Sequence, residues 1–163
     1  MLALSGGVGT ASDGTGAVLG TTISWEITPR VGVEGTATWL DRQTGASAFA
    51  AALTVHAILM RSRRLSPFVE GGFGMYLATF DPHRATTIPA FYADRMSGIQ
   101  KETFTDPAFF MAAGLDLFRT SHVTIRPVIG AIVAVGGSHA YTVGTFTIRA
   151  EYHFEDHPVT LSR

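Results

Sequence analysis

Seven charged residues occupy positions at which the surrounding sequence alternates between apolar and polar side chains. They are Glu26, Glu34, Glu70, Asp116, Arg126, Arg149 and Glu151. Such alternation indicates β-strands, whose successive side chains point to opposite faces, and each of the seven falls on the polar face of its segment. Five carboxylates and two guanidinium groups, joined by His56 and His153, predict a buried network of ion pairs. Pairing is required because an isolated buried charge strongly destabilises a fold.

Two functions are compatible with such a charge network. The first is a salt-bridge plug that fills a narrow protein interior. The second is a small gated pore whose conductance depends on exchange of ion-pair partners. The plug is the simpler interpretation and the one we expect, because a small barrel leaves an interior barely wide enough for its own side chains.

Residues for enzymatic or metal chemistry are poorly placed in this sequence. Ser138 and His139 are adjacent, but neighbouring strand residues face opposite sides, which suits a nucleophile and its base poorly. We find no two histidines that share a metal-ligand spacing with a carboxylate on one face. The glycine pair Gly71-Gly72 is not followed by a helix, as a dinucleotide site would require. With 0 cysteines as well, we predict no catalytic residue, no metal site and no cofactor.

One long polar segment, residues 81–103, is a candidate binding loop. It combines aromatic residues with charge at Phe91, Tyr92 and Arg95. Binding residues often lie on loops that a rigid scaffold holds in place. The simplest alternative is a mobile external loop with no fixed ligand, and the sequence leaves the ligand unidentified.

Eight alternating segments must position these side chains. They cover residues 2–10, 16–27, 31–42, 47–60, 67–80, 104–118, 123–136 and 141–154. Most match or exceed the roughly 9–11 residues that a tilted strand needs to cross a membrane. We find no amphipathic helical stretch between them, which argues against a βαβ organisation. The pattern predicts one all-β domain over residues 1–154, an eight-stranded antiparallel up-and-down barrel, followed by a polar tail over residues 155–163.

The connections between segments are expected to alternate in length. Those after the second, fourth and sixth segments are short turns, one of them carrying Pro29, and would lie at one end with both termini. The other four would be longer loops at the opposite end, and residues 81–103 are the longest of them. This asymmetry is typical of outer-membrane barrels.

Alternation alone leaves the sense of the two faces open. A soluble lipocalin-like barrel would place its apolar face inside, whereas a transmembrane barrel places it outside. The polar face here is rich in glycine and alanine, which suits a crowded interior, and Lys101 is the only lysine among 12 basic residues. Four aromatic residues near strand ends fit the girdles that mark membrane–water interfaces, namely Trp25, Trp39, Tyr152 and Phe154. We therefore predict a transmembrane barrel.

Composition adds several limits. The formal net charge is −1 and there is no basic stripe, so a nucleic-acid partner is not expected. No apolar run approaches the roughly 20 residues of a membrane helix. The N-terminus lacks the layout of a secretion signal, and we expect a trimmed start because residues 2–9 already have strand character.

Several short sequences resemble those of the OmpA/OmpX-like eight-stranded outer-membrane β-barrels. They are Pro67-Phe68-Val69-Glu70-Gly71-Gly72-Phe73-Gly74, Gly114-Leu115-Asp116-Leu117-Phe118, Ile125-Arg126-Pro127 and Tyr152-His153-Phe154. The resemblance implies the outer membrane of a Gram-negative envelope as location and outer-membrane lipid as surroundings. It also implies recognition by the barrel-assembly machinery through the aromatic-x-Phe ending. Nine residues follow Phe154, where the family often stops.

The resulting functional expectation is a non-enzymatic, membrane-anchored scaffold that presents external loops. Adhesion, partner binding or a narrow pore would be its activities. One alternative is the soluble lipocalin-like ligand-binding barrel. The other is a lipid A-modifying barrel enzyme, a hydrolase or acyltransferase, although the sequence contains no His-x-Ser-Asn phrase of the deacylase kind.

Overall fold

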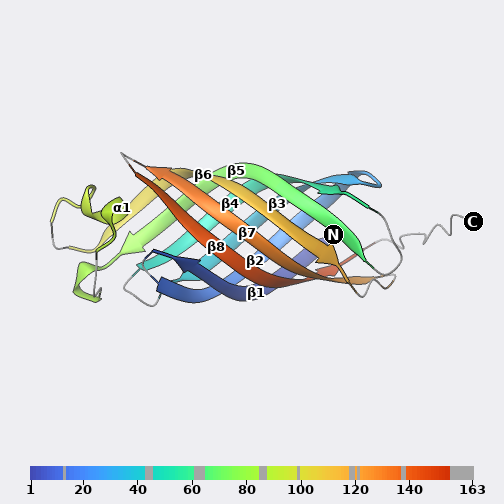
Figure 1. The fold of residues 1–163 in the computed structure, drawn as a ribbon, viewed down its shortest axis with the longest axis horizontal. Helices are drawn as coiled ribbons and strands as arrows, with labels where there is room; N and C mark the ends of the chain where they lie inside the picture. The colour runs from blue at the N-terminus through green and yellow to red at the C-terminus, as the bar shows by residue number, and fades with distance from the viewer. Residues whose placement is uncertain are drawn as a thin grey trace, which may run out of the picture.

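The chain forms a closed, all-antiparallel barrel of eight strands, as the sequence predicts. The structure, a computed structural model, describes residues 1–12, 14–42, 46–60, 65–84, 88–98, 100–117, 120, 122–136 and 139–154. The strands are β1 (Leu2–Ala11), β2 (Gly14–Thr28), β3 (Val31–Asp41), β4 (Ala46–Ile58), β5 (Ser66–Phe80), β6 (Glu102–Asp116), β7 (Val123–Gly136) and β8 (His139–Tyr152). Each pairs with the next, and β1 pairs with β8 to close the sheet (Figure 1). The predicted polar tail, residues 155–163, lies outside the described residues.

The described part of the connection between β5 and β6 contains two short helices. They are η1 (Pro82–Arg84) and α1 (Ala90–Ala93). Helix α1 lies at one end of the barrel, here called the mouth, and the N-terminus and the end of β8 lie at the opposite end, the turn end (Figure 1). No helix in the described ranges is long and apolar enough to cross a membrane.

The predicted alternation of short turns and longer loops holds only in part. At the mouth, residues 81–101 form one long connection, but residues 12–13, 42–45 and 137–138 are all that separate the other strand pairs. At the turn end, residues 59–65 and 117–122 form longer connections than these. The strands extend further toward the mouth than the sequence pattern indicates, because Gly14 and His139 already belong to β2 and β8. The long connection is therefore the main feature of the mouth.

The outer face of the barrel is apolar. Large hydrophobic side chains such as Phe73 (67% exposed) and Ile148 (54% exposed) point outward, whereas Arg149 is 7% exposed. This orientation is the reverse of a soluble lipocalin-like barrel and agrees with a membrane-facing surface. The predicted interface aromatics Trp25, Trp39, Tyr152 and Phe154 are all exposed. Trp39 lies toward the mouth, across from Phe49 on β4, and the other three lie toward the turn end.

The inner face has two distinct halves, which the sequence analysis does not anticipate. Toward the turn end it carries most of its charged residues, among them Glu34, Arg126 and Arg149. Toward the mouth it is apolar and aromatic, with a core that includes Val18, Leu40, Tyr76, Phe80, Phe104, Tyr141 and Val143. Because inward positions simply continue the same parity along each strand, Tyr141 and Val143 share a face with Thr145, Thr147 and Arg149.

Adjacent glycines on β5 allow a sharp test of this architecture. Gly72 faces inward, and a Cβ at this position would collide with the backbone of Leu53 and Thr54 on β4. Gly71 faces outward, and a Cβ there would meet nothing within 4 Å. The close approach of β5 to β4 thus requires glycine at one position and tolerates a side chain at the next.

We expect Gly72→Ala to lower the free energy of unfolding by about 1–3 kcal/mol, the usual effect of overpacking. Gly71→Ala is the matched control and should leave stability within about 0.5 kcal/mol. Urea unfolding of both variants in phospholipid vesicles would measure the difference. Equal stabilities would show that Gly72 does not face the lumen as described.

Candidate functional site

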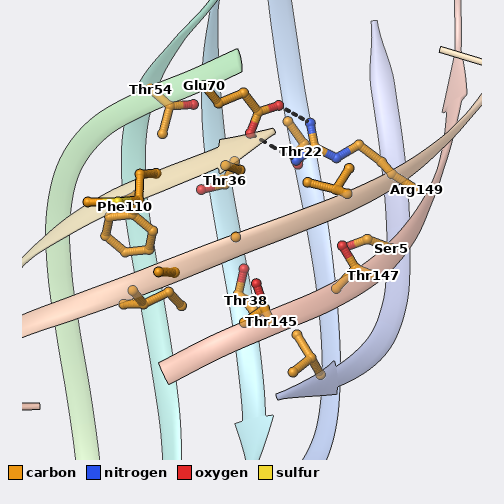
Figure 2. Close-up of a pocket in the computed structure, with 17 residues that line it drawn as sticks. Ser5, Thr22, Thr36, Thr38, Thr54, Glu70, Phe110, Thr145, Thr147 and Arg149 are labelled. Atoms are coloured by element: carbon orange, nitrogen blue, oxygen red, sulfur yellow. Dashed lines mark hydrogen bonds and ion pairs between the residues drawn. The ribbon is translucent and has the colours of Figure 1, made fainter. Parts of the chain in front are cut away.

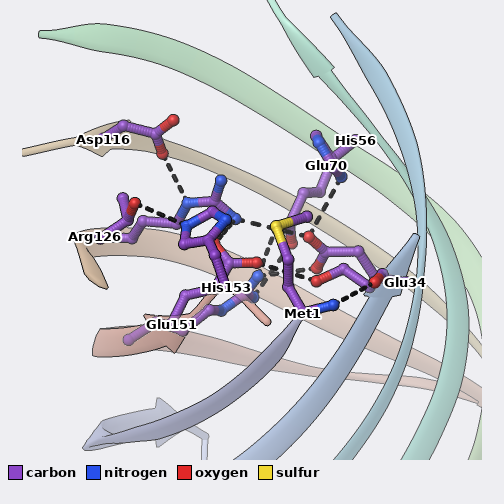
Figure 3. Close-up of polar contacts among 11 residues, drawn as sticks. Met1, Glu34, His56, Glu70, Asp116, Arg126, Glu151 and His153 are labelled. Atoms are coloured by element: carbon purple, nitrogen blue, oxygen red, sulfur yellow. Dashed lines mark hydrogen bonds and ion pairs between the residues drawn. The ribbon is translucent and has the colours of Figure 1, made fainter. Parts of the chain in front are cut away.

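An ion-pair network fills the lumen toward the turn end (Figure 3). It contains Glu34, Glu70, Asp116, Arg126, Arg149 and Glu151, six of the seven residues singled out from the sequence. The seventh, Glu26, is exposed near the end of β2 and is not buried with the others. The network comes from five strands, so only closure of the barrel brings it together.

The two arginines lie directly opposite each other on β7 and β8. Opposed like charges destabilise a sheet unless carboxylates compensate them. Arg149 Nη1 donates to Glu34 Oε2 and to Glu70 Oε1, both at 2.8 Å. Arg126 Nε donates to Asp116 Oδ1 at 2.6 Å, and its Nη1 lies 2.7 Å from Glu151 Oε2. Each guanidinium is therefore held between two carboxylates.

Glu34 joins the two halves of the network. Its side chain is 0% exposed, and its Oε1 lies 3.7 Å from Arg126 Nη1 while its Oε2 accepts from Arg149. His56 Nδ1 lies 3.2 Å from the same Oε1. Strand β3 thus supplies the carboxylate that links β7 and β8 across the lumen.

Neutral side chains complete the polar end of the lumen. Ser24 Oγ donates to Glu151 Oε1 at 2.9 Å, and Thr124 Oγ1 lies 2.9 Å from His153 Nε2. The Phe68 ring packs against the Arg126 guanidinium, 5.2 Å from its centroid. These contacts fix the charged groups in place, so the interior here is a packed polar core.

Strand register explains one ion pair locally. The pairs Gly114↔Val128 and Leu117↔Ile125 place Asp116 opposite Arg126. The two carboxylates that pair with Arg149 come from β3 and β5, which are not neighbours of β8 in the sheet. Pairing within one face can be inferred from register, whereas contacts across the lumen depend on the diameter of the barrel.

The mouth is filled by α1. Phe91 and Tyr92 are 4% and 0% exposed and pack among the inward aromatic residues of the strands. The Tyr92 ring stacks on Phe80 with centroids 4.6 Å apart, and the Phe91 ring stacks on Tyr141 at 5.1 Å. We call this aromatic cluster, Phe91 and Tyr92 with Phe80, Phe104 and Tyr141, the mouth plug.

Charged groups fasten the mouth plug to the barrel wall. Arg95 Nη1 and Nη2 donate to the two carboxylate oxygens of Asp106 at 2.6 and 2.7 Å. The Arg95 guanidinium also lies over the rings of Phe91 and Phe104, at 5.1 and 4.6 Å. Asp94, the residue after α1, pairs with His139 at the start of β8 at 2.9 Å.

The structure therefore places the aromatic residues of the candidate binding loop inside the barrel. Phe91 and Tyr92 are enclosed by the barrel and are not displayed on its surface, and Arg95 is bound to Asp106. Aromatic and charged residues that occur together in a polar loop predict a recognition surface, but the sequence does not show whether the mouth of the barrel is wide enough to admit the rings. Here the mouth accepts both rings.

Two buried charges of the mouth were missed by the sequence analysis. Asp106 is 3% exposed and Arg42 is 1% exposed, with Arg42 Nη2 donating to the Gly14 carbonyl at 2.8 Å. A usable signal exists for Asp106, because it has the same parity as Asp116 and so shares the inward face of β6. The same signal exists for Arg42, which is the last residue of the predicted segment 31–42 and has the parity of Glu34, although β3 itself ends at Asp41.

A chamber of about 80 Å³ lies in the lumen next to the ion-pair network, and apolar side chains such as Val18, Phe110 and Ile132 line it together with polar ones (Figure 2). Hydroxyl side chains dominate its polar wall, namely Ser5, Thr22, Thr36, Thr38, Thr54, Thr145 and Thr147. Glu70 and Arg149 also line it, so the chamber is in contact with the network. Among the described residues, no three His, Asp or Glu side chains are grouped so that they could hold a metal ion.

Comparison with known proteins identifies the fold. No family model matches the chain, and no curated protein sequence matches it. Among solved structures, Neisserial surface protein A (NspA) matches with a TM-score of 0.69 and 10% identity, over 94% of each chain. The N-terminal β-barrel domain of Pseudomonas aeruginosa OprF matches with a TM-score of 0.62 and 11% identity, over 91% of this chain and 95% of the other.

A third match shows the functional breadth of this fold. The outer-membrane enzyme PagL aligns with a TM-score of 0.53 and 15% identity, over 91% of this chain and 97% of PagL. Non-enzymatic barrels and an enzyme thus share one architecture. At these identities the likeness shows the fold alone. This chain has the fold of the eight-stranded outer-membrane β-barrels, to which the OmpA/OmpX-like proteins belong.

Proposed function

We propose that this chain is a non-enzymatic barrel that is anchored in the bacterial outer membrane and presents a small, rigid surface at its mouth. The observation that carries the proposal is the distribution of side chains between the two faces of the sheet. Large apolar groups such as Ile129 and Phe73 cover the outside, and charged groups such as Glu34 are enclosed. In water this arrangement would expose a continuous apolar band, whereas in a bilayer the band contacts lipid.

The proposed partners follow from the same surface. Outer-membrane lipid would contact the apolar band, with Trp25 and Trp39 at opposite interfaces. The barrel-assembly machinery would recognise the last strand and the exposed Phe154 beyond it. An external ligand would contact polar groups around Asp94 and His139, which are about half exposed.

The filled lumen favours the function of a membrane anchor and argues against that of a pore. The mouth plug and the ion-pair network lie in series along the lumen, and both are packed from several strands. A hydrated ion would have to displace buried rings and then break compensated ion pairs, which carries a large desolvation cost. A narrow pore would therefore need a rearrangement of both elements.

Because the enzyme PagL has the same fold, the competing proposal is that this chain is also an enzyme. Ser121 and Ser138 each precede a histidine in the sequence, and both serines lie outside the described residues. His139 Nδ1 is bound to Asp94 at the mouth, which is the arrangement of a surface latch as much as of a catalytic dyad. We favour the non-enzymatic anchor because the Asp94–His139 contact joins the end of α1 to the start of β8, which gives it a structural role.

A folding experiment separates these functions. The purified chain should fold in detergent micelles or vesicles into a form that migrates faster on unheated gels than after boiling. The vesicles should show no ion flux above that of protein-free vesicles. Folding as a compact monomer in plain buffer would contradict the membrane anchor. Stable conductance steps would favour a pore, and loss of a lipid A acyl chain on expression would favour an enzyme.

A further inference from the structure

We propose that the long connection between β5 and β6 carries a binding site for an extended segment of a partner protein, in which aliphatic side chains stand beside acidic ones. The site is a groove of about 290 Å³, here called the loop groove, and it is lined by Pro82, Ile88, Ala93, Met96, Ser97 and Gly98. The inference rests on the function proposed above, because it names the surface with which the anchored barrel would contact its partner.

The loop groove is apolar although it lies outside the membrane-facing surface of the barrel. Ile88 is 46% exposed and belongs to the connection that carries α1 at the mouth (Figure 1). Ala93, the last residue of α1, is exposed as well. On the strands, exposed aliphatic groups contact lipid, whereas here they form a concave surface in a loop. Concave apolar surfaces of this kind are typical of binding sites.

Hydrogen bonds and packing hold the walls of the loop groove in place. The Ser97 backbone N–H and hydroxyl both donate to Glu102 Oε1, at 3.0 and 2.7 Å. Met96 packs against the aromatic core of the mouth. On the other wall, the His83 backbone N–H donates to Asp81 Oδ1 at 3.0 Å, which fixes the short helix η1. The groove is therefore formed before a partner binds, which lowers the entropy cost of binding.

The charges near the loop groove favour an acidic partner. Three carboxylates of this region already have partners, namely Asp81 with the His83 amide, Asp94 with His139 and Glu102 with Ser97. Arg84 and Lys101 are exposed, and neither forms an ion pair with any residue that the structure describes. Arg84 is two residues from Pro82, and Lys101 is three residues from Gly98. The charge left for a partner is thus positive, and complementary charge guides association.

The size of the loop groove favours side chains of a protein segment as its occupant. Its volume of about 290 Å³ is at the lower limit of the roughly 300–1,000 Å³ that is usual for small-molecule pockets. The six residues that line it include no charged side chain, and the Ser97 hydroxyl is already bonded to Glu102. The lining can therefore hold one or two aliphatic groups, and orientation must come from charges at the rim.

Three short peptides test both parts of this recognition. The probe is acetyl-Asp-Leu-Leu-Asp-amide, added to the folded barrel in uncharged micelles and followed by methyl nuclear magnetic resonance. It should shift the methyl signals of Ile88, Ala93 and Met96, and it should bind about tenfold more tightly than acetyl-Lys-Leu-Leu-Lys-amide. Acetyl-Asp-Ser-Ser-Asp-amide, which has no aliphatic side chain, should cause no shift. The methyl groups of Met111 and Ile148 face lipid and report any peptide that enters the micelle.

Two variants assign the binding to the loop groove. Ile88→Ser removes an apolar wall, and Arg84→Glu reverses a charge at the rim. Both residues are exposed, so the barrel should fold as the wild type does. Each change should weaken binding of the acidic peptide about tenfold or more, as read from Ala93 and Met96. Arg30→Glu, at an exposed position in the turn between β2 and β3, is the matched control and should leave binding unchanged.

The outcomes separate this proposal from the membrane anchor on which it rests. A barrel that folds in micelles but shows no shift at the three groove methyls would overturn the loop groove as a binding site and leave the anchor intact. Equal binding of the acidic and basic peptides would also overturn it. Octanoate that shifts the same methyls at lower concentration than the acidic peptide would assign the groove to a lipid acyl chain. Failure to fold in micelles would contradict the anchor itself.

Discussion

Replacement of Arg149 by alanine is expected to destabilise the folded barrel by about 3–5 kcal/mol, the range seen when one partner of a buried ion pair is removed. The variant would leave Glu70 without its guanidinium partner and deprive Glu34 of its contact at 2.8 Å. Because Arg126 already forms ion pairs with Asp116 and Glu151, it cannot replace the Arg149 guanidinium without breaking those pairs. Urea unfolding in vesicles, followed by tryptophan fluorescence, would measure the loss.

Two control variants make this prediction specific. Arg30→Ala removes an exposed arginine from the turn between β2 and β3 and should change stability by less than about 0.5 kcal/mol. The double variant with Arg149→Ala and Glu70→Gln should recover part of the loss, because one uncompensated carboxylate has been removed. An Arg149→Ala barrel with the heat resistance of the wild type would refute the buried network.

The second large effect is expected at the mouth. Truncation of both rings of α1, Phe91→Ala with Tyr92→Ala, removes two buried aromatic side chains, each of which contributes about 3–5 kcal/mol in a typical core. The strand pairs of the barrel remain, so we expect local opening of the long connection with the sheet intact. Each 1.4 kcal/mol corresponds to about a tenfold change in an equilibrium constant. The open population should therefore rise by more than about 100-fold.

Limited proteolysis would measure this opening. Trypsin cleaves after Arg84 and Lys101, which lie in the long connection on either side of α1. Cleavage should become much faster in the double variant, while the barrel fragments stay associated and run as folded protein on unheated gels. Ile88→Ala, at an exposed position in the same connection, should leave the rate unchanged. A double variant cleaved at the wild-type rate would show that α1 does not depend on its rings for docking.

These two experiments also bear on the filled lumen. Loss of the mouth plug alone should leave vesicles impermeable, because the ion-pair network still occupies the turn end. Loss of Arg149 alone should do the same while α1 remains docked. Ion flux through vesicles that contain either the mouth-plug variant or Arg149→Ala would mean that the element left intact does not close the lumen. The anchor proposal would then have to be revised.

The sequence by itself determined the strands, their number and the sense of each face. Period-two alternation is a local property of the chain, so it puts Glu34 and Arg149 on polar faces and Phe73 and Ile148 on apolar faces with no knowledge of the fold. The small residues of the polar face and the scarcity of lysine then favour the polar face as the inner one. The same parity places Asp106 inside, although the sequence analysis did not use it there. Strand ends were less certain, because polar residues such as Thr15 and His139 extend the strands beyond the alternating segments.

Only the tertiary structure decided which side chains meet. Arg149 binds Glu34 and Glu70 from strands that are not its neighbours, and such contacts depend on the curvature and diameter of the closed sheet. The same holds for the mouth, where Phe91 and Tyr92 form a single helical turn whose burial depends on the width left by Phe80, Phe104 and Tyr141. Periodicity assigns each residue to a face. Contacts across a lumen require the distances between faces, and those exist only once the barrel has closed.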